Sequence, residues 1–184
     1  MANMKHFVKI SVVASFLLGC FVLVFYFTAY SSPPDDFEQN YEYVSRLPES
    51  IDPTGEKIVI IDPKVHAWGA YDPEGDLVAA GLATAGADWC SDIRRACRTK
   101  AGTFRVFSLG SVHCKSSIFP IPRGGAPMPY CMFFNRNQAM HGSHGKNVIE
   151  GNASHGCVRL RIEDAEWLRK NFVDIGTMVT VYPY

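Results

Sequence analysis

The stretch Ser154-His155-Gly156-Cys157-Val158-Arg159, with His141-Gly142 upstream of it, is the most informative part of this chain. A cysteine attacks a carbonyl only as its thiolate, and a nearby imidazole can accept the thiol proton. A glycine beside the cysteine lets the backbone approach the reacting carbonyl, because no Cβ stands in the way. Successive backbone N–H groups in such a segment can hold the oxyanion that forms on attack. The stretch therefore predicts a thiol acyl-transfer enzyme.

Length and composition bound the class of protein. The 184 residues suit one domain with an N-terminal extension. The 18 Lys and Arg residues balance the 18 Asp and Glu residues, so no net charge attracts the chain to nucleic acid, and we expect no nucleic-acid partner. About 150 residues follow the apolar N-terminus, enough for a self-sufficient hydrophobic core.

The N-terminal segment predicts a membrane anchor. Residues 10–29 carry no charge, and a helix of about 20 residues spans the hydrocarbon layer. Lys5 and Lys9 precede this segment and Asp35 and Asp36 follow it, so the positive-inside rule places residues 1–9 in the cytoplasm. The remaining chain then lies in the periplasm or faces the cell wall. The alternative is a signal peptide cleaved near 29–31, which would release a secreted protein.

Five cysteines follow the membrane segment: Cys90, Cys97, Cys114, Cys131 and Cys157. Cys90 and Cys97 enclose a loop short enough to close locally, and pairing Cys114 with Cys131 leaves Cys157 unpaired. Four cysteines alone allow three connectivities, so the sequence leaves the pairing open. An odd thiol in an exported chain is notable, and here it lies beside His155.

The pattern of apolar residues predicts a mainly β domain at 57–184, behind a Pro-containing linker at 30–56. The helix expected at 163–172 places its apolar residues on one side and carries acidic residues in its first turns. We expect strands at 57–61, 65–71, 77–84, 102–109, 130–135, 138–141, 156–160 and 178–182. A single helical turn is expected at 41–47.

These motifs resemble the catalytic domain of the L,D-transpeptidases, the YkuD-like family of cell-wall enzymes. Its signature is a His followed by Ser/Thr-His-Gly-Cys, matched here by His141 and Ser154-His155-Gly156-Cys157. The segment 126–135 also looks like the one that leads to the family's histidine. Residues 99–104 resemble the family's Thr-Pro-x-Gly element, although Lys100 stands where proline is common. The resemblance covers the whole of 57–184.

The resemblance implies a β-sandwich of mixed sheets with its active site under a mobile lid. It also implies cleavage of a peptidoglycan stem tetrapeptide after its third residue, a diamino acid, with release of the terminal D-Ala. The acyl group would pass through a thioester to an amine of another stem, giving a 3→3 cross-link, or to another amine or water. The expected partners are thus stem peptides and, through the N-terminal helix, the membrane.

By position, the resemblance makes Cys157 the nucleophile and His141 the general base, oriented by the carbonyl of Gly142. The segment from Ser154 to Cys157 would supply the oxyanion site through the backbone N–H groups of His155, Gly156 and Cys157. Arg159 would support this loop or the substrate. We expect no cofactor.

Other interpretations stay open. His141, His144, His155 and Cys157 offer zinc ligands, but their spacing does not match the usual zinc motifs, so we expect no metal. The same site used hydrolytically would be a carboxypeptidase or amidase, and a wall-binding or host-contact protein would keep the fold with minor catalysis. Arg94, Arg95, Arg98 and Lys100 form either a solvated basic surface or a docking site for acidic wall material. The oligomeric state is not predicted.

Overall fold

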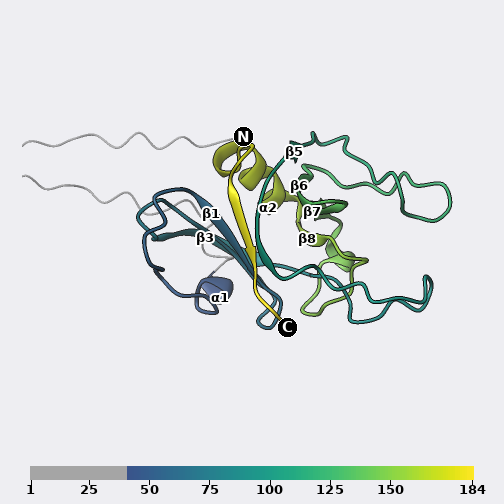
Figure 1. The fold of residues 1–184 in the computed structure, drawn as a ribbon, viewed down its shortest axis with the longest axis horizontal. Helices are drawn as coiled ribbons and strands as arrows, with labels where there is room; N and C mark the ends of the chain where they lie inside the picture. Colours follow the sequence, from purple (N-terminus) through teal and green to yellow (C-terminus); the bar gives the residue numbers. More distant parts are fainter. Residues whose placement is uncertain (1–40) are drawn as a thin grey trace, which may run out of the picture. The chain divides into compact units, whose positions relative to one another are not determined.

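The computed structural model describes residues 41–184, which contain two mixed β-sheets and one substantial helix (Figure 1). The first sheet has the order β3-β2-β1-β9-β4. Strand β9 runs parallel to β1, and the other pairings are antiparallel. The strands are β1 (Ile58–Asp62), β2 (Ala67–Tyr71), β3 (Leu77–Leu82), β4 (Gly102–Arg105) and β9 (Met178–Val181).

The second sheet has the order β5-β6-β7-β8 and carries the residues of the predicted site. Strands β7 and β8 are parallel, so residues at their adjacent ends approach each other from distant parts of the chain. The strands are β5 (Ser108–Leu109), β6 (Met132–Asn135), β7 (Gln138–Ser143) and β8 (Val158–Arg161). A short 3-10 turn, η2 (Gly145–Asn147), follows β7.

One hydrophobic core joins the two sheets and the helix. Apolar side chains from β1, β2 and β9 meet those of β6, β7 and β8, and Ala165, Leu168 and Phe172 of the helical segment complete the cluster. The helical segment consists of α2 (Ile162–Trp167) and a wider last turn, η3 (Leu168–Phe172). It contacts β7 and β8, and therefore fixes the sheet that bears the site.

The expectation of a mainly β fold with mixed sheets and one helix is confirmed, but one predicted strand was wrong. Residues 102–109 form two strands in different sheets, because the chain crosses from one sheet to the other at Val106 and Phe107. The Val106 N–H donates to the Thr177 carbonyl, whereas the Phe107 N–H donates to the Phe133 carbonyl. Apolar residues continue to alternate with other residues through Val106 and Phe107, so the sequence pattern gives no sign of this crossing. The helix also begins one residue earlier than predicted.

Part of the expected linker packs on the domain. Residues Tyr41–Val44 form the single turn α1, and the side chains of Tyr43 and Leu47 are buried with Ala67, Ala80 and Leu82. Within residues 41–184, no helix is long and apolar enough to cross a membrane. The expected cytoplasmic residues 1–9 and anchor 10–29 lie outside the described residues.

Candidate active site

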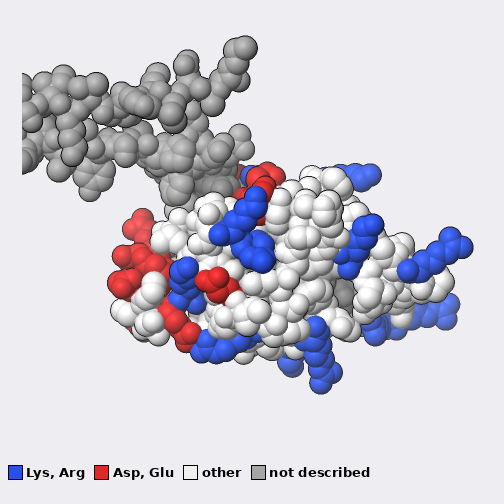
Figure 2. Space-filling view, turned by 90° about the horizontal axis from the view of Figure 1, so that it is seen from above, with Lys and Arg blue, Asp and Glu red and all other residues white. Residues whose placement is uncertain are grey.

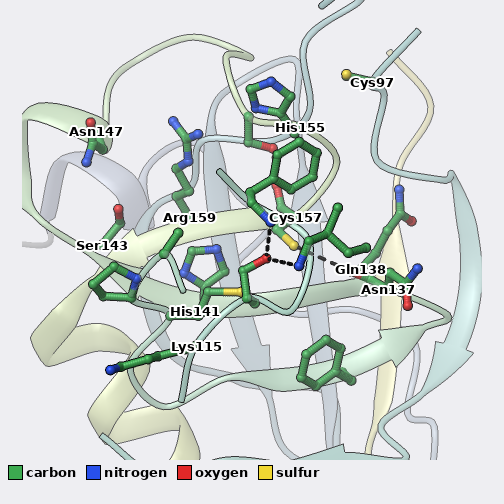
Figure 3. A pocket seen from close by; sticks show the side chains of 18 of the residues that line it. Cys97, Lys115, Asn137, Gln138, His141, Ser143, Asn147, His155, Cys157 and Arg159 are labelled. Carbon is green, nitrogen blue, oxygen red and sulfur yellow. Dashed lines mark hydrogen bonds between the residues drawn. The ribbon is translucent and has the colours of Figure 1, made fainter. Parts of the chain in front are cut away.

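A cleft of about 570 Å³ opens over the second sheet and contains both predicted catalytic side chains. Its floor comes from β7 and β8. Its walls come from the loop after β3, which includes Arg95 to Arg98, and from the long loop between β5 and β6. We call residues 111–130 the β5–β6 loop. Figure 3 shows side chains from these segments converging on Cys157.

His141 and Cys157 lie on the same face of the β7–β8 pair. His141 stands directly opposite Arg159 in the parallel register, and Cys157 precedes Arg159 by two residues. Because side chains alternate between faces along a strand, all three point into the cleft. Figure 3 shows His141 beside Cys157 with Arg159 next to it.

A hydrogen bond to the neighbouring residue fixes the tautomer of His141. Its Nδ1 lies 2.8 Å from the Gly142 carbonyl oxygen, which can only accept, so Nδ1 carries the hydrogen. The other ring nitrogen, Nε2, is then left as the proton acceptor. A Cβ at position 142 would meet the Ile162 Cα at 3.0 Å, so a larger residue here would press on the backbone at the start of α2.

Burial keeps both partners neutral. The His141 residue is only 6% exposed, and this burial lowers the pKa of its imidazole to about 4, although the Gly142 carbonyl opposes the shift. Burial also raises the pKa of the Cys157 thiol. The thiol lies 3.6 Å from the Asn137 carbonyl oxygen and packs near Met128 and Ala139. The resting pair is therefore thiol and neutral imidazole.

The turn that leads to Cys157 is held by Ser154. Its buried Oγ accepts the Gly156 N–H at 3.0 Å and donates to the Cys157 carbonyl. Gly156 has φ +117°, a conformation that residues with a side chain rarely adopt. The Gly156 N–H, one of the three expected oxyanion donors, is thus already engaged. The His155 and Cys157 N–H groups have no partner among residues 41–184.

Thr99 supports the same turn, a role that the sequence analysis did not assign. Its buried Oγ1 donates to the Gly156 carbonyl at 3.0 Å and accepts the Gly86 N–H at 2.9 Å. The Tyr184 hydroxyl accepts the Thr99 N–H and donates to the Gly86 carbonyl. The resemblance at 99–104 was the available signal, but it did not show which group Thr99 contacts.

The His155 side chain makes its contacts with residues other than Cys157. Its Nε2–H donates to Asp92 Oδ2 at 2.7 Å, and its ring packs against Phe119 with 4.5 Å between the centroids. In the view of Figure 3 the His155 ring lies above Cys157, whereas the His141 ring lies to the left of Cys157. His155 therefore joins the two loops that border the cleft, and its ring is not placed to act as the base.

Two disulfides tether these bordering loops and leave one thiol. Cys90 pairs with Cys97, and Cys114 pairs with Cys131, whereas Cys157 is unpaired. This is one of the three pairings of those four cysteines that leave Cys157 free. Ligand atoms of Cys90, Asp92 and His155 lie within 4.8 Å of one another. This set does not fit a metal ion, because the Cys90 sulfur is bonded to Cys97.

Comparison with known proteins identifies the family of the chain and proteins of similar fold. Residues 56–181 match the L,D-transpeptidase catalytic domain family, YkuD. A crystal structure of an L,D-transpeptidase from Xylanimonas cellulosilytica has a TM-score of 0.61 and 23% identity, covering 79% of this chain and 68% of that one. None of the curated proteins matches the sequence.

Two mycobacterial structures are similar in fold. L,D-transpeptidase 3 from Mycobacterium tuberculosis, in complex with a faropenem-derived adduct, has a TM-score of 0.56 and 22% identity over 70% of this chain and 60% of that one. An L,D-transpeptidase from Mycobacterium smegmatis has a TM-score of 0.57 and 20% identity over 70% and 59% of the two chains. This chain thus spans about three fifths of these two proteins. The family match covers most of the described domain, and the chain belongs to the L,D-transpeptidase catalytic domain family.

Proposed function

We propose that this protein is a cysteine-dependent L,D-transpeptidase that joins peptidoglycan stem peptides through a Cys157 thioester. One observation carries the proposal: the Gly142 carbonyl fixes His141 as a neutral base beside the unpaired thiol. The family match at 56–181 supports stem tetrapeptides as the substrate class. The expected products are 3→3 cross-links.

Acylation begins when Cys157 Sγ attacks the carbonyl carbon of the third stem residue. His141 Nε2 takes the thiol proton, and the imidazolium is held through Nδ1–H by the Gly142 carbonyl. The His155 and Cys157 N–H groups stabilise the oxyanion. The C–N bond then breaks, the leaving nitrogen receives the proton from His141, and D-Ala departs. This leaves a thioester and a neutral imidazole.

Deacylation repeats the sequence with a second stem. The side-chain amine of its diamino acid attacks the thioester carbonyl and gives a proton to His141. The C–S bond breaks, and the proton passes to the sulfur, which restores the thiol. The buried, neutral His141 suits both steps, since it accepts and returns one proton in each.

Intact-mass analysis with a carbapenem and with a stem tetrapeptide tests the nucleophile. We expect a covalent adduct on the wild type and on His113→Ala, which changes an exposed histidine outside the cleft. Cys157→Ala should show no adduct, and His141→Gln should slow adduct formation strongly. An adduct that survives Cys157→Ala overturns the assignment of the nucleophile.

Product analysis tests the reaction. Purified wall digested after incubation with the protein should contain new 3→3 dimers. Tripeptides alone indicate the hydrolytic alternative. An unchanged wall despite a Cys157 adduct favours a binding protein with minor catalysis.

We also propose that the domain works outside the cytoplasm, anchored by residues 10–29. The two disulfides support this location, because such bonds persist mainly in oxidising compartments. A reporter that is active only outside the cytoplasm, fused after Tyr184, should therefore be active. A cytoplasmic reporter signal contradicts the expected topology.

A further inference from the structure

The cleft is cationic although the chain is neutral. Its lining contains no aspartate or glutamate but includes five basic side chains: Arg95, Arg98, Lys115, Arg136 and Arg159. Figure 2 shows acidic side chains gathered at one end of the domain, while basic ones cover other parts of the surface. An uneven distribution of this kind attracts an anionic ligand to the cationic side.

Most of these cations lack an acidic partner. Arg98 pairs with Asp88 at 2.7 Å. In contrast, no carboxylate of residues 41–184 lies within 4.0 Å of Arg95, Lys115, Arg136 or Arg159. Arg95, Lys115 and Arg136 are exposed on the rim, where water solvates their charge.

Arg159 is different, because it is half-buried and next to the reacting atoms. Its side chain makes no hydrogen bond within the described residues, and burial lowers the pKa of its guanidinium. A cation that loses water without gaining a partner is unfavourable. The site therefore becomes more stable when an anion binds there.

The position of Arg159 determines which part of the substrate must carry the anion. Arg159 lies on β8, two residues after Cys157, and is directly opposite His141. Its charge is close enough to lower the pKa of both the His141 imidazole and the Cys157 thiol, and in the view of Figure 3 the guanidinium points away from the His141 ring. A carbonyl held at Cys157 places groups one residue away within reach of a long arginine side chain. The guanidinium is planar and binds a carboxylate through two parallel hydrogen bonds.

We propose that Arg159 binds a substrate carboxylate adjacent to the scissile amide, and that the protein therefore selects stem peptides whose carboxylates are free rather than amidated. This inference rests on the proposed function and specifies its substrate class. Two groups carry this chemistry: the α-carboxylate of the leaving residue and the side-chain carboxylate of the diamino acid. Arg95, Lys115 and Arg136 draw such anionic peptides toward the cleft.

Four tetrapeptides distinguish these sources. The first has both carboxylates, the second has an amide at its C-terminus, the third has an amide on the diamino acid, and the fourth has both amides. Acylation of Cys157 is followed by mass, and kcat/KM is measured for each peptide. We expect the wild type to prefer one free acid over its amide by about 10- to 100-fold, the range for a paired charge-assisted contact.

Three variants identify the group responsible. Arg159→Gln should bring the acid-to-amide ratio close to one, and Arg159→Lys should restore it only in part, because lysine keeps the charge without the planar fork. Arg105→Gln, whose charge pairs with Glu56 outside the cleft, should keep the wild-type ratio. Carbapenem labelling of each variant reports whether the site is intact.

The outcomes separate this inference from the proposed function. Equal rates on all four peptides by a wild type that acylates Cys157 overturn the carboxylate selection alone. A preference that persists in Arg159→Gln, with carbapenem labelling retained, also overturns it. No acylation by any peptide or carbapenem instead overturns the proposed function.

Discussion

Replacing Gly156 with alanine should separate catalysis from stability at this site. Gly156 has φ +117°, and an added Cβ would lie 3.1 Å from Gln138 Nε2 and 3.4 Å from the Cys97 carbonyl oxygen. Holding a residue with a side chain in such a conformation costs about 1–3 kcal/mol. Any relaxation of that strain rotates the two peptide groups that flank Gly156, and one of them carries the Cys157 N–H expected to stabilise the oxyanion.

The two consequences have different magnitudes. For a domain of this size, each kcal/mol lowers the Tm by about 2–4 °C, so we expect a loss of about 2–12 °C. A displaced oxyanion donor costs about 10²- to 10³-fold in rate. Gly176→Ala is the matched control, because Gly176 has φ +98°, nothing within 4 Å of an added Cβ, and a place outside the cleft.

Thermal unfolding and single-turnover acylation by a tetrapeptide are measured for both variants. Both should unfold at lower temperature, and Gly176→Ala should keep a rate within about threefold of the wild type, well below the loss of an oxyanion donor. Gly156→Ala should acylate at least about 10²-fold more slowly. If the folded Gly156→Ala protein acylates as fast as Gly176→Ala, the backbone of this turn does not stabilise the oxyanion.

Three further predictions concern protonation. Alkylation of Cys157 by iodoacetamide should accelerate about tenfold per pH unit between about pH 6 and 8, because burial raises the thiol pKa and the thiolate is the reactive form; a rate that is flat in this range contradicts the neutral pair. The pKa of His141 is about 4 in the folded protein against 6.5 in a free histidine, so the unfolded chain takes up this proton first as pH falls. The free energy of unfolding, measured by urea titration, should therefore decrease by about 3 kcal/mol more from pH 7 to pH 4 in the wild type than in His141→Gln. Asp164 accepts the Trp68 indole N–H at 3.3 Å, and burial raises its pKa from 3.8 to about 6, so the fold loses stability as the pH rises between these two values. Asp164→Asn should raise the free energy of unfolding at pH 8 by about 1–3 kcal/mol and leave it nearly unchanged at pH 4, and equal effects at both values would exclude this cause.

Local patterns predicted most of the strands, and the family resemblance implied the central pair of the site. The resemblance to the L,D-transpeptidases implied that His141 and Cys157 share a site, and the parallel register of β7 and β8 shows how two distant segments meet. The division of 102–109 between two sheets was missed. Phe104 and Val106 are apolar and alternate with other residues in the same way whether the chain stays in one sheet or crosses to the other. Strand crossings depend on the partners, Thr177 and Phe133, which local periodicity does not contain.

The charge of the cleft was the least predictable property. The sequence indicated a basic cluster from Arg94 to Lys100, but only Arg95 and Arg98 of that cluster line the cleft. Lys115, Arg136 and Arg159 come from separate loops and strands, and nothing in their spacing relates them. Likewise, the capture of the Gly156 N–H by Ser154 depends on the turn geometry rather than on residue types.

The two disulfides and the unpaired thiol impose opposite redox requirements on one small domain. Cys114 and Cys131 must be oxidised to form their disulfide. Cys157, which packs against the same cluster, must stay reduced. Oxidants and foreign disulfides react with the thiolate, so a thiol whose pKa is raised by burial is a poor target for both. The burial that keeps Cys157 protonated and weakly reactive in the resting protein thus allows the two disulfides to form in an oxidising medium while the nucleophile stays reduced.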